Sequence, residues 1–152
     1  MRHLIERVLE LTESEMANST PVAPPMGEGS EVELKALLES LQPRIRVYGV
    51  GGAGCNAIGR LHSEGLFENS YVTGYAINTD AQALLMSPID EKVLIGRTAR
   101  GRGAGGDPAK GEAAALESEL VLRRITNDTQ LAIITAGMGG GSGTGAAGQI
   151  AR

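Results

Sequence analysis

Cysteine, aromatic residues and long apolar runs are all scarce in this sequence, and each scarcity excludes a class of protein. Cys55 is the single cysteine, so no internal disulfide can form and a reducing compartment is expected. Aromatic residues make up 3% of the chain, and the net charge is −4, which argues against a nucleic-acid partner. No apolar run approaches the roughly 20 residues that a membrane-spanning helix needs, so we expect no direct membrane insertion.

The N-terminal part of the chain divides into three predicted segments. Residues 1–17 are predicted to form an amphipathic helix, and their charged residues argue against a signal peptide. Residues 18–30 are rich in proline, glycine and serine, which predicts a disordered linker. Residues 31–42 are predicted to form a second helix with Ser30 as its N-cap, because leucines recur at helical spacing: Leu34, Leu37, Leu38 and Leu41.

From residue 43 onward, four apolar segments alternate with helical ones. The predicted strands are 44–50, 71–78, 92–96 and 131–136, and the predicted helices are 56–65, 80–86 and 107–126. This alternation is typical of an α/β fold: a Rossmann-like parallel sheet with helices on both faces. Asp80 and Asp107 are expected to cap two of these helices. The buried face of helix 107–126 is predicted to consist of Leu116, Leu120, Val121 and Ile125.

Glycine is abundant, with 22 residues, and it gathers where the predicted strands end. We call these segments the first (49–56), second (78–82), third (96–108) and fourth (137–145) exits. In a parallel sheet all four meet at the carboxyl edge, where ligands bind. Glycine lets backbone N–H groups approach a ligand, and helix N-termini add partial positive charge. The four exits therefore predict a cradle for a polyphosphate.

The first exit by itself permits a different function. Gly49, Gly51 and Gly54 fit G-x-G-x-x-G, whose best-known use is NAD or FAD binding in oxidoreductases. That use requires an acidic residue at the end of the second strand, where this chain has Asn78, with Asp80 two residues later. The fourth exit is not a Walker A loop, because it has no lysine. Backbone amides and hydroxyls, chiefly those of Ser142 and Thr144, are therefore expected to hold the phosphates. An inactive interaction module is a third alternative.

Four motifs in order carry a resemblance to a known family. They are GVGGAGCNAIGRL, AINTDAQALL, GRGAGGDPAKGEAA and TAGMGGGSGTGAA. Together they resemble the nucleotide-binding half of the tubulin/FtsZ family, and in particular its cell-division GTPases, in a form more archaeal than bacterial. The resemblance covers about residues 41–152, and it implies an N-terminal, truncated part of the GTP-binding domain.

The resemblance implies a role for each exit. The first would lie against the α- and β-phosphates, although Ala53 and Cys55 interrupt its usual run of glycines. The second would approach the phosphates and a bound Mg²⁺ through Asp80, the third would sense the γ-phosphate, and the fourth would wrap the phosphate tail. The implied nucleotide-binding residues are Gly52, Ala53, Gly54, Cys55, Asn56, Asn78, Asp80, Gln82, Ala104, Gly105, Gly106, Gly139, Gly140, Gly141, Ser142, Gly143, Thr144 and Gly145.

The resemblance also implies a setting for the protein. GTP or GDP with Mg²⁺ would be the ligand, with guanine inferred from the family rather than from these residues. Family members form head-to-tail filaments and hydrolyse GTP with an acidic loop from the neighbouring subunit. No catalytic residue is therefore expected in this chain. The expected location is the cytoplasm at the division site, with other division proteins as partners.

Overall fold

A computed structural model describes residues 28–68 and 71–152, which belong to two separate compact units, Met1–Leu41 and Gln42–Arg152. In the first unit the structure describes helix α2, Glu28–Leu41. The helix begins three residues earlier than expected, so Ser30 lies inside it rather than at its N-cap position. The predicted helix 1–17 and residues 18–27 of the predicted linker lie outside the described residues. The described side chains of α2 include exposed apolar ones: Val32, Leu34, Leu37, Leu38 and Leu41.

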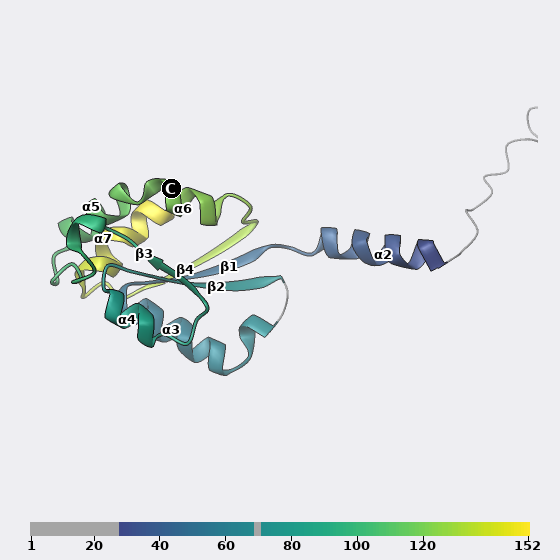
Figure 1. Cartoon of the computed structure of the whole chain (residues 1–152), viewed down its shortest axis with the longest axis horizontal. Coiled ribbons are helices and arrows are strands. Elements are labelled where there is room, and N and C mark those ends of the chain that lie inside the picture. The colour runs from purple at the N-terminus through teal and green to yellow at the C-terminus, as the bar shows by residue number, and fades with distance from the viewer. Residues whose placement is uncertain (1–27, 69–70) are drawn as a thin grey trace, which may run out of the picture. The chain divides into compact units, whose positions relative to one another are not determined.

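The second unit is built on a four-stranded parallel sheet with the order β3-β2-β1-β4 (Figure 1). Its strands are β1 (Ile45–Val50), β2 (Val72–Asn78), β3 (Glu91–Leu94) and β4 (Leu131–Ala136). The predicted strands are confirmed to within two residues at each end. Because all four run the same way, their carboxyl ends meet at one edge, which lies on the left in Figure 1.

Helices cover both faces of the sheet, as predicted (Figure 1). One face carries α3 (Gly51–Ser63) and α4 (Ala81–Met86), and the other carries α5 (Pro108–Glu117), α6 (Glu119–Thr126) and α7 (Gly141–Ile150). Two short 3₁₀ helices, η1 (Leu66–Glu68) and η2 (Arg97–Ala99), lie in the connections. In the described part of the chain, no helix has the length and apolarity to cross a bilayer.

Each face of the sheet has its own apolar core. Successive side chains of a strand point to opposite faces, so β1 contributes to both cores. The core under α5, α6 and α7 is centred on Tyr48, Val50 and Ile77. The core under α3 and α4 is centred on Val47, Ile58 and Ala76. These two cores fix the sheet, and with it the positions of the four exits.

Local sequence signals set the starts of two helices. Asp80 Oδ1 accepts hydrogen bonds from the backbone N–H groups of Gln82 and Ala83, which caps α4 as predicted. Asp107 Oδ1 accepts one from Ala109 N–H, with Pro108 at the first position of α5. Side-chain capping of this kind stabilises a helix by typically about 1 kcal/mol.

The predicted helix 107–126 is interrupted at Ser118, and its predicted buried face is wrong for Leu116, Leu120 and Val121, whereas the partly buried Ile125 packs against the core as predicted. The Gly96 N–H donates to Ser118 Oγ (2.9 Å), and the chain restarts there as α6. Leu116 and Leu120 are 53% and 86% exposed, and Val121 is also exposed, whereas Leu122 is buried. The core-facing residues nevertheless keep one helical spacing across the break, so the predicted face is displaced around the helix rather than disrupted by the break: they are Gly111, Ala114, Ala115, Ser118, Leu122 and Ile125.

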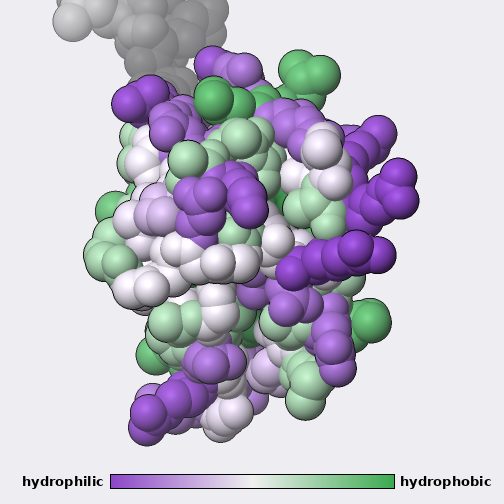
Figure 2. Space-filling view, turned by 90° about the vertical axis from the view of Figure 1, so that its left-hand side faces the viewer, coloured by the Kyte–Doolittle hydropathy of each residue, from purple (hydrophilic) through white to green (hydrophobic). Residues whose placement is uncertain are grey.

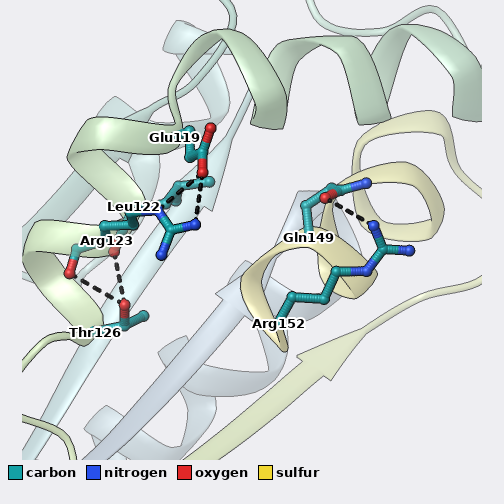
Figure 3. Close-up of polar contacts among 6 residues, drawn as sticks. All are labelled: Glu119, Leu122, Arg123, Thr126, Gln149 and Arg152. Carbon is teal, nitrogen blue, oxygen red and sulfur yellow. Dashed lines mark hydrogen bonds and ion pairs between the residues drawn. The ribbon is translucent and has the colours of Figure 1, made fainter.

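Figure 3 shows the polar contacts on α6. Arg123 points outward and pairs with Glu119 at 2.8 Å, while Thr126 Oγ1 donates to the Leu122 carbonyl (3.1 Å). The ion pair is exposed and joins residues one helical turn apart, so it contributes only a few tenths of a kcal/mol to the stability of the fold. Burial of Leu122 against the sheet therefore fixes α6 in place.

Helices α5 and α7 contact each other backbone to backbone through glycines. A Cβ at Gly111 would collide with the Gly141 carbonyl, and one at Gly145 would collide with the Pro108 carbonyl and the Glu112 N–H. Glycine is therefore required here for packing. The contact brings the N-terminal ends of α5 and α7, which follow the third and fourth exits, side by side.

Candidate functional site

The first and fourth exits face each other across a cavity at the carboxyl edge of the sheet. The cavity has a volume of about 310 Å³, and most of its lining is glycine: Val50, Gly51, Gly52, Ala53, Gly137, Gly139, Gly140, Gly141, Ser142 and Gly143. We call it the cradle. Figure 2 faces this edge and shows a pale zone of near-neutral residues bordered by hydrophilic ones. Ser142 brings the one side-chain hydroxyl among the lining residues.

The backbones of the first and fourth exits lie so close together that some positions in them require glycine. Gly51 has φ +71°, and a Cβ on it would lie 2.6 Å from Gly143 N. A Cβ on Gly143 would lie 2.8 Å from the Gly137 carbonyl oxygen. By contrast, Gly52, Gly139 and Gly140 have open space where a Cβ would stand. Gly51 and Gly143 are therefore required for close packing of the two exits. The other three glycines leave room for a ligand.

Two helices begin at the cradle with free N–H groups. The N-cap residues of α3 and α7 are Val50 and Gly140, and neither gives a side-chain capping bond. The first N–H groups of a helix have no partner within the helix, and the helix dipole makes this end partly positive. The cradle therefore has the chemistry of an anion-binding site. Its run of glycines exposes backbone N–H groups that can bind the oxygens of a phosphate chain.

Thr79 joins the second exit to the third and fourth exits; it lies within the predicted second exit, although the implied nucleotide-binding residues do not include it. Its side chain is 1% exposed, and its Oγ1 lies 2.6 Å from Ser142 Oγ. Its carbonyl accepts from Gly103 N–H (3.1 Å) in the third exit. The buried Asn78 supports this arrangement, since its Oδ1 accepts from Thr79 N–H (2.8 Å).

The third exit lies beside the second through backbone hydrogen bonds. Ala81 N–H donates to the Gly101 carbonyl (3.1 Å), and Asp80 and Arg102 form an isolated bridge. Ala104 is buried, whereas Gly105 and Gly106 are exposed with positive φ and open space around them. These two glycines are free to contact a ligand. Arg97, Arg100 and Arg102 are exposed on this exit and make it locally positive.

Several predicted site residues lie away from the cradle lining. Thr144 Oγ1 is buried with no hydrogen-bond partner among the described residues, and Gly145 packs against α5. Gly54 packs against the Thr135 carbonyl. Cys55 is buried, and Asn56 is exposed beside Gly52 in a separate groove of about 520 Å³ between α3 and α4. A nucleotide role for these residues stays a prediction.

Cys55 behaves as a packed apolar side chain. Burial raises the pKa of its thiol to about 11, and the thiol contacts the carbonyls of Gly49 (3.4 Å) and Ile77 (3.6 Å). A helix N-terminus alone would lower a thiol pKa, but desolvation dominates here. The thiol is neutral at pH 7 and is not a nucleophile.

A magnesium ion fits this edge only as a partner of bound phosphates. Within residues 28–68 and 71–152, no three His, Cys, Asp or Glu side chains stand close enough to hold a metal. Mg²⁺ is commonly held by one or two carboxylates together with phosphate oxygens and water. Asp80 is the carboxylate of the second exit, and its Oδ1 already accepts two N–H bonds from α4, so a magnesium role for it stays a prediction.

Comparison with known proteins gives the family. The sequence pattern described as "Tubulin/FtsZ family, GTPase domain" matches residues 44–152. The chain belongs to the tubulin/FtsZ family. One family member, the cell division protein FtsZ 1 of Pyrococcus horikoshii, is 43% identical over 152 residues, which cover 99% of this chain and 40% of the relative.

Solved structures of the tubulin/FtsZ family share the fold. An FtsZ dimer of M. jannaschii is 44% identical with a TM-score of 0.70, over 80% of this chain and 35% of that one. CetZ2 from Haloferax volcanii, in a GTPγS-bound protofilament, is 30% identical with a TM-score of 0.63, over 71% and 34%. The chain thus spans about 40% of the length of the curated relatives it matches. The predicted family and α/β fold class are confirmed.

Proposed function

We propose that this chain binds the phosphates of GTP or GDP as the phosphate-binding part of a filament-forming GTPase of cell division. The observation that carries the proposal is the cradle, where two helix N-termini and a glycine backbone surround about 310 Å³. Membership of a GTPase family supports guanine nucleotide as the ligand.

The competing function is that of an NAD- or FAD-dependent oxidoreductase, based on the G-x-G-x-x-G of the first exit. A dinucleotide fold has no need of a second glycine loop opposite the first. In this chain the fourth exit supplies six of the ten residues that line the cradle. That arrangement favours a triphosphate ligand.

Ligand-dependent melting tests the proposal directly. A ligand that binds the folded state raises the melting temperature in proportion to the logarithm of its concentration above Kd. We expect GDP and GTP to stabilise the chain and NADH to leave its melting temperature unchanged. Stabilisation by NADH alone would reverse the assignment.

We propose that Mg²⁺ joins the site through bound phosphates and Asp80, and that the third exit senses the γ-phosphate. The remaining predicted contacts, Gly54, Cys55, Asn56, Thr144 and Gly145 among them, belong to the same proposal. The protein would act in the cytoplasm at the division site, in head-to-tail filaments and with other division proteins. Relatives described as a dimer and as protofilaments support self-association.

A phosphate-release assay tests the catalytic part of the proposal. Hydrolysis in this scheme requires an acidic loop from a neighbouring subunit, so the 152-residue chain with GTP and Mg²⁺ should release phosphate no faster than buffer. Turnover by the chain alone would place a catalytic group among these residues, and Asp80→Asn would then be the first variant to assay.

A further inference from the structure

We propose that Thr79 is a positioning residue that sets the direction of the Ser142 hydroxyl in the cradle. The inference rests on the proposed function. Its structural basis is the 2.6 Å contact between Thr79 Oγ1 and Ser142 Oγ, which joins the second and fourth exits across 63 positions of sequence. Ser142 is the residue common to this contact and to the cradle lining.

The chemistry of the ligand decides which hydroxyl donates. A serine hydroxyl has one proton, and ionised phosphate oxygens only accept hydrogen bonds. If Ser142 donated to Thr79, its lone pairs would face the anion. When Thr79 donates to Ser142, the Ser142 proton is free to point at a phosphate oxygen. Thr79 therefore selects the productive orientation without touching the ligand.

The surroundings of Thr79 hold its side chain in place. The residue is 1% exposed, its N–H is bound to Asn78 Oδ1 and its carbonyl to Gly103 N–H. A buried hydroxyl with a fixed backbone has few orientations. The contacts of Thr79 with Gly103 and with Ser142 link the second, third and fourth exits, so the position of Ser142 is tied to that of the neighbouring exits.

The test is a graded series at position 79, read by calorimetric binding of GDP and of inorganic triphosphate to the 152-residue chain. Thr79→Ser keeps the donor, Thr79→Cys keeps a weak one, and Thr79→Val removes it at nearly constant volume. We expect Ser to bind within twofold of the unaltered chain, Val about three- to tenfold more weakly, and Cys in between. The matched control is Thr126→Val on α6, outside the four exits, where the hydroxyl donates to the Leu122 carbonyl (3.1 Å); it should not affect affinity.

A double-mutant cycle separates positioning from general damage. Ser142→Ala should weaken binding about as much as Thr79→Val, and the double variant should bind no more weakly than Ser142→Ala alone. Losses that multiply would show that Thr79 acts by another route and would overturn the inference. Equal affinity of Thr79→Val and the unaltered chain would also overturn it. If Thr79→Val does not fold, equal affinity of Thr79→Cys and the unaltered chain decides against it.

The two proposals fail in different ways. If the unaltered chain binds neither GDP nor inorganic triphosphate, the proposed function fails and this inference falls with it. If the unaltered chain binds them and the series at position 79 is flat, the inference alone fails. Melting of each variant without ligand checks the fold: a purely structural role for Thr79 lowers stability but leaves the cycle with Ser142 additive.

Discussion

Gly140 and Gly143 lie three residues apart on the fourth exit, yet a side chain at each has a different effect. Gly143 faces the Gly137 carbonyl, so any side chain there disturbs the fold before it reaches a ligand. Gly140 has open space and is the N-cap of α7. Position 140 is therefore the cleaner probe of the cradle.

We expect Gly140→Asp to abolish stabilisation by GDP while the chain stays folded. Aspartate is a favourable N-cap and suits the positive helix end, so the unliganded chain should gain a few tenths of a kcal/mol. The same carboxylate occupies and repels the phosphate position. Melting curves with and without GDP measure both effects, with the neutral Gly140→Asn as control. A GDP shift that survives in the aspartate variant would place the phosphates elsewhere.

The buried thiol of Cys55 predicts a particular pH dependence. Its pKa is about 11 in the folded chain against an ordinary value of 9.0. The neutral thiol is favoured by folding, so its contribution to stability is complete below pH 9 and is lost as the pH rises through 11. Urea unfolding between pH 8 and 11.5 should show a steeper loss in the unaltered chain than in Cys55→Ala, where only other groups such as Tyr48, whose pKa burial also raises, still lose stability as the pH rises. Fast alkylation of the folded chain at pH 8 would contradict the burial.

How far sequence predicts a single residue depends on whether its role is local. Asp80 and Asp107 were found because a cap acts on the N–H groups two or three residues away. Thr79 was missed because its role depends on Ser142, 63 positions along the chain. The sequence does hold one signal for it: Thr79 lies at the end of a strand, between the predicted site residues Asn78 and Asp80.

At the scale of helices and strands, local patterns predict the strands and the starts of α4 and α5 well, but they miss the start of α3 and the break between α5 and α6. Helix α3 begins at Gly51, five residues before the expected start, because tertiary contacts with the fourth exit demand glycine where propensity disfavours it. The break at Ser118 depends on a hydrogen bond from Gly96, 22 positions earlier. No local pattern contains either contact.

Because α5 and α7 contact each other through glycines, two glycine-to-alanine substitutions in α7 should have opposite effects on stability. Gly145→Ala should lower the free energy of unfolding by about 1–3 kcal/mol, because the new methyl collides with α5 backbone. Gly148→Ala, one turn later with nothing within 4 Å, should raise it by about 0.5–1 kcal/mol through helix propensity. Urea titrations of both variants measure the contrast. Equal effects of the two substitutions would mean that α5 and α7 are further apart than described.

At the scale of the whole sheet, the two edge strands differ in charge and in exposed apolar surface. The β3 edge has four residues with exposed Glu91 and Lys92, which discourage pairing. The β4 edge has six residues without charge, and Leu131 and Ile133 are about half exposed. Within the described residues, β4 pairs with β1 alone.

We therefore expect the 152-residue chain to self-associate as its concentration rises. Ile133→Lys should suppress this association, because a buried charge in a paired strand edge is unfavourable. Leu120→Lys, on the exposed side of α6, is the control and should have a smaller effect. Sedimentation velocity over a range of concentrations measures both. A monomer at every concentration, or equal suppression by the two variants, would exclude the β4 edge as the contact.

The asymmetry of the two edges also bears on how such a domain could be divided and reassembled. A sheet with one charged edge and one apolar edge accepts a further strand on a single side. A complementary fragment from a longer relative, expressed separately, would have one place to anneal, along β4. The cradle lies at the end of that same strand, so annealing would be reported by the affinity of a phosphate ligand. This unit could therefore serve as one of two fragments in a complementation assay, in which binding of a phosphate ligand reports that the second fragment has paired with β4.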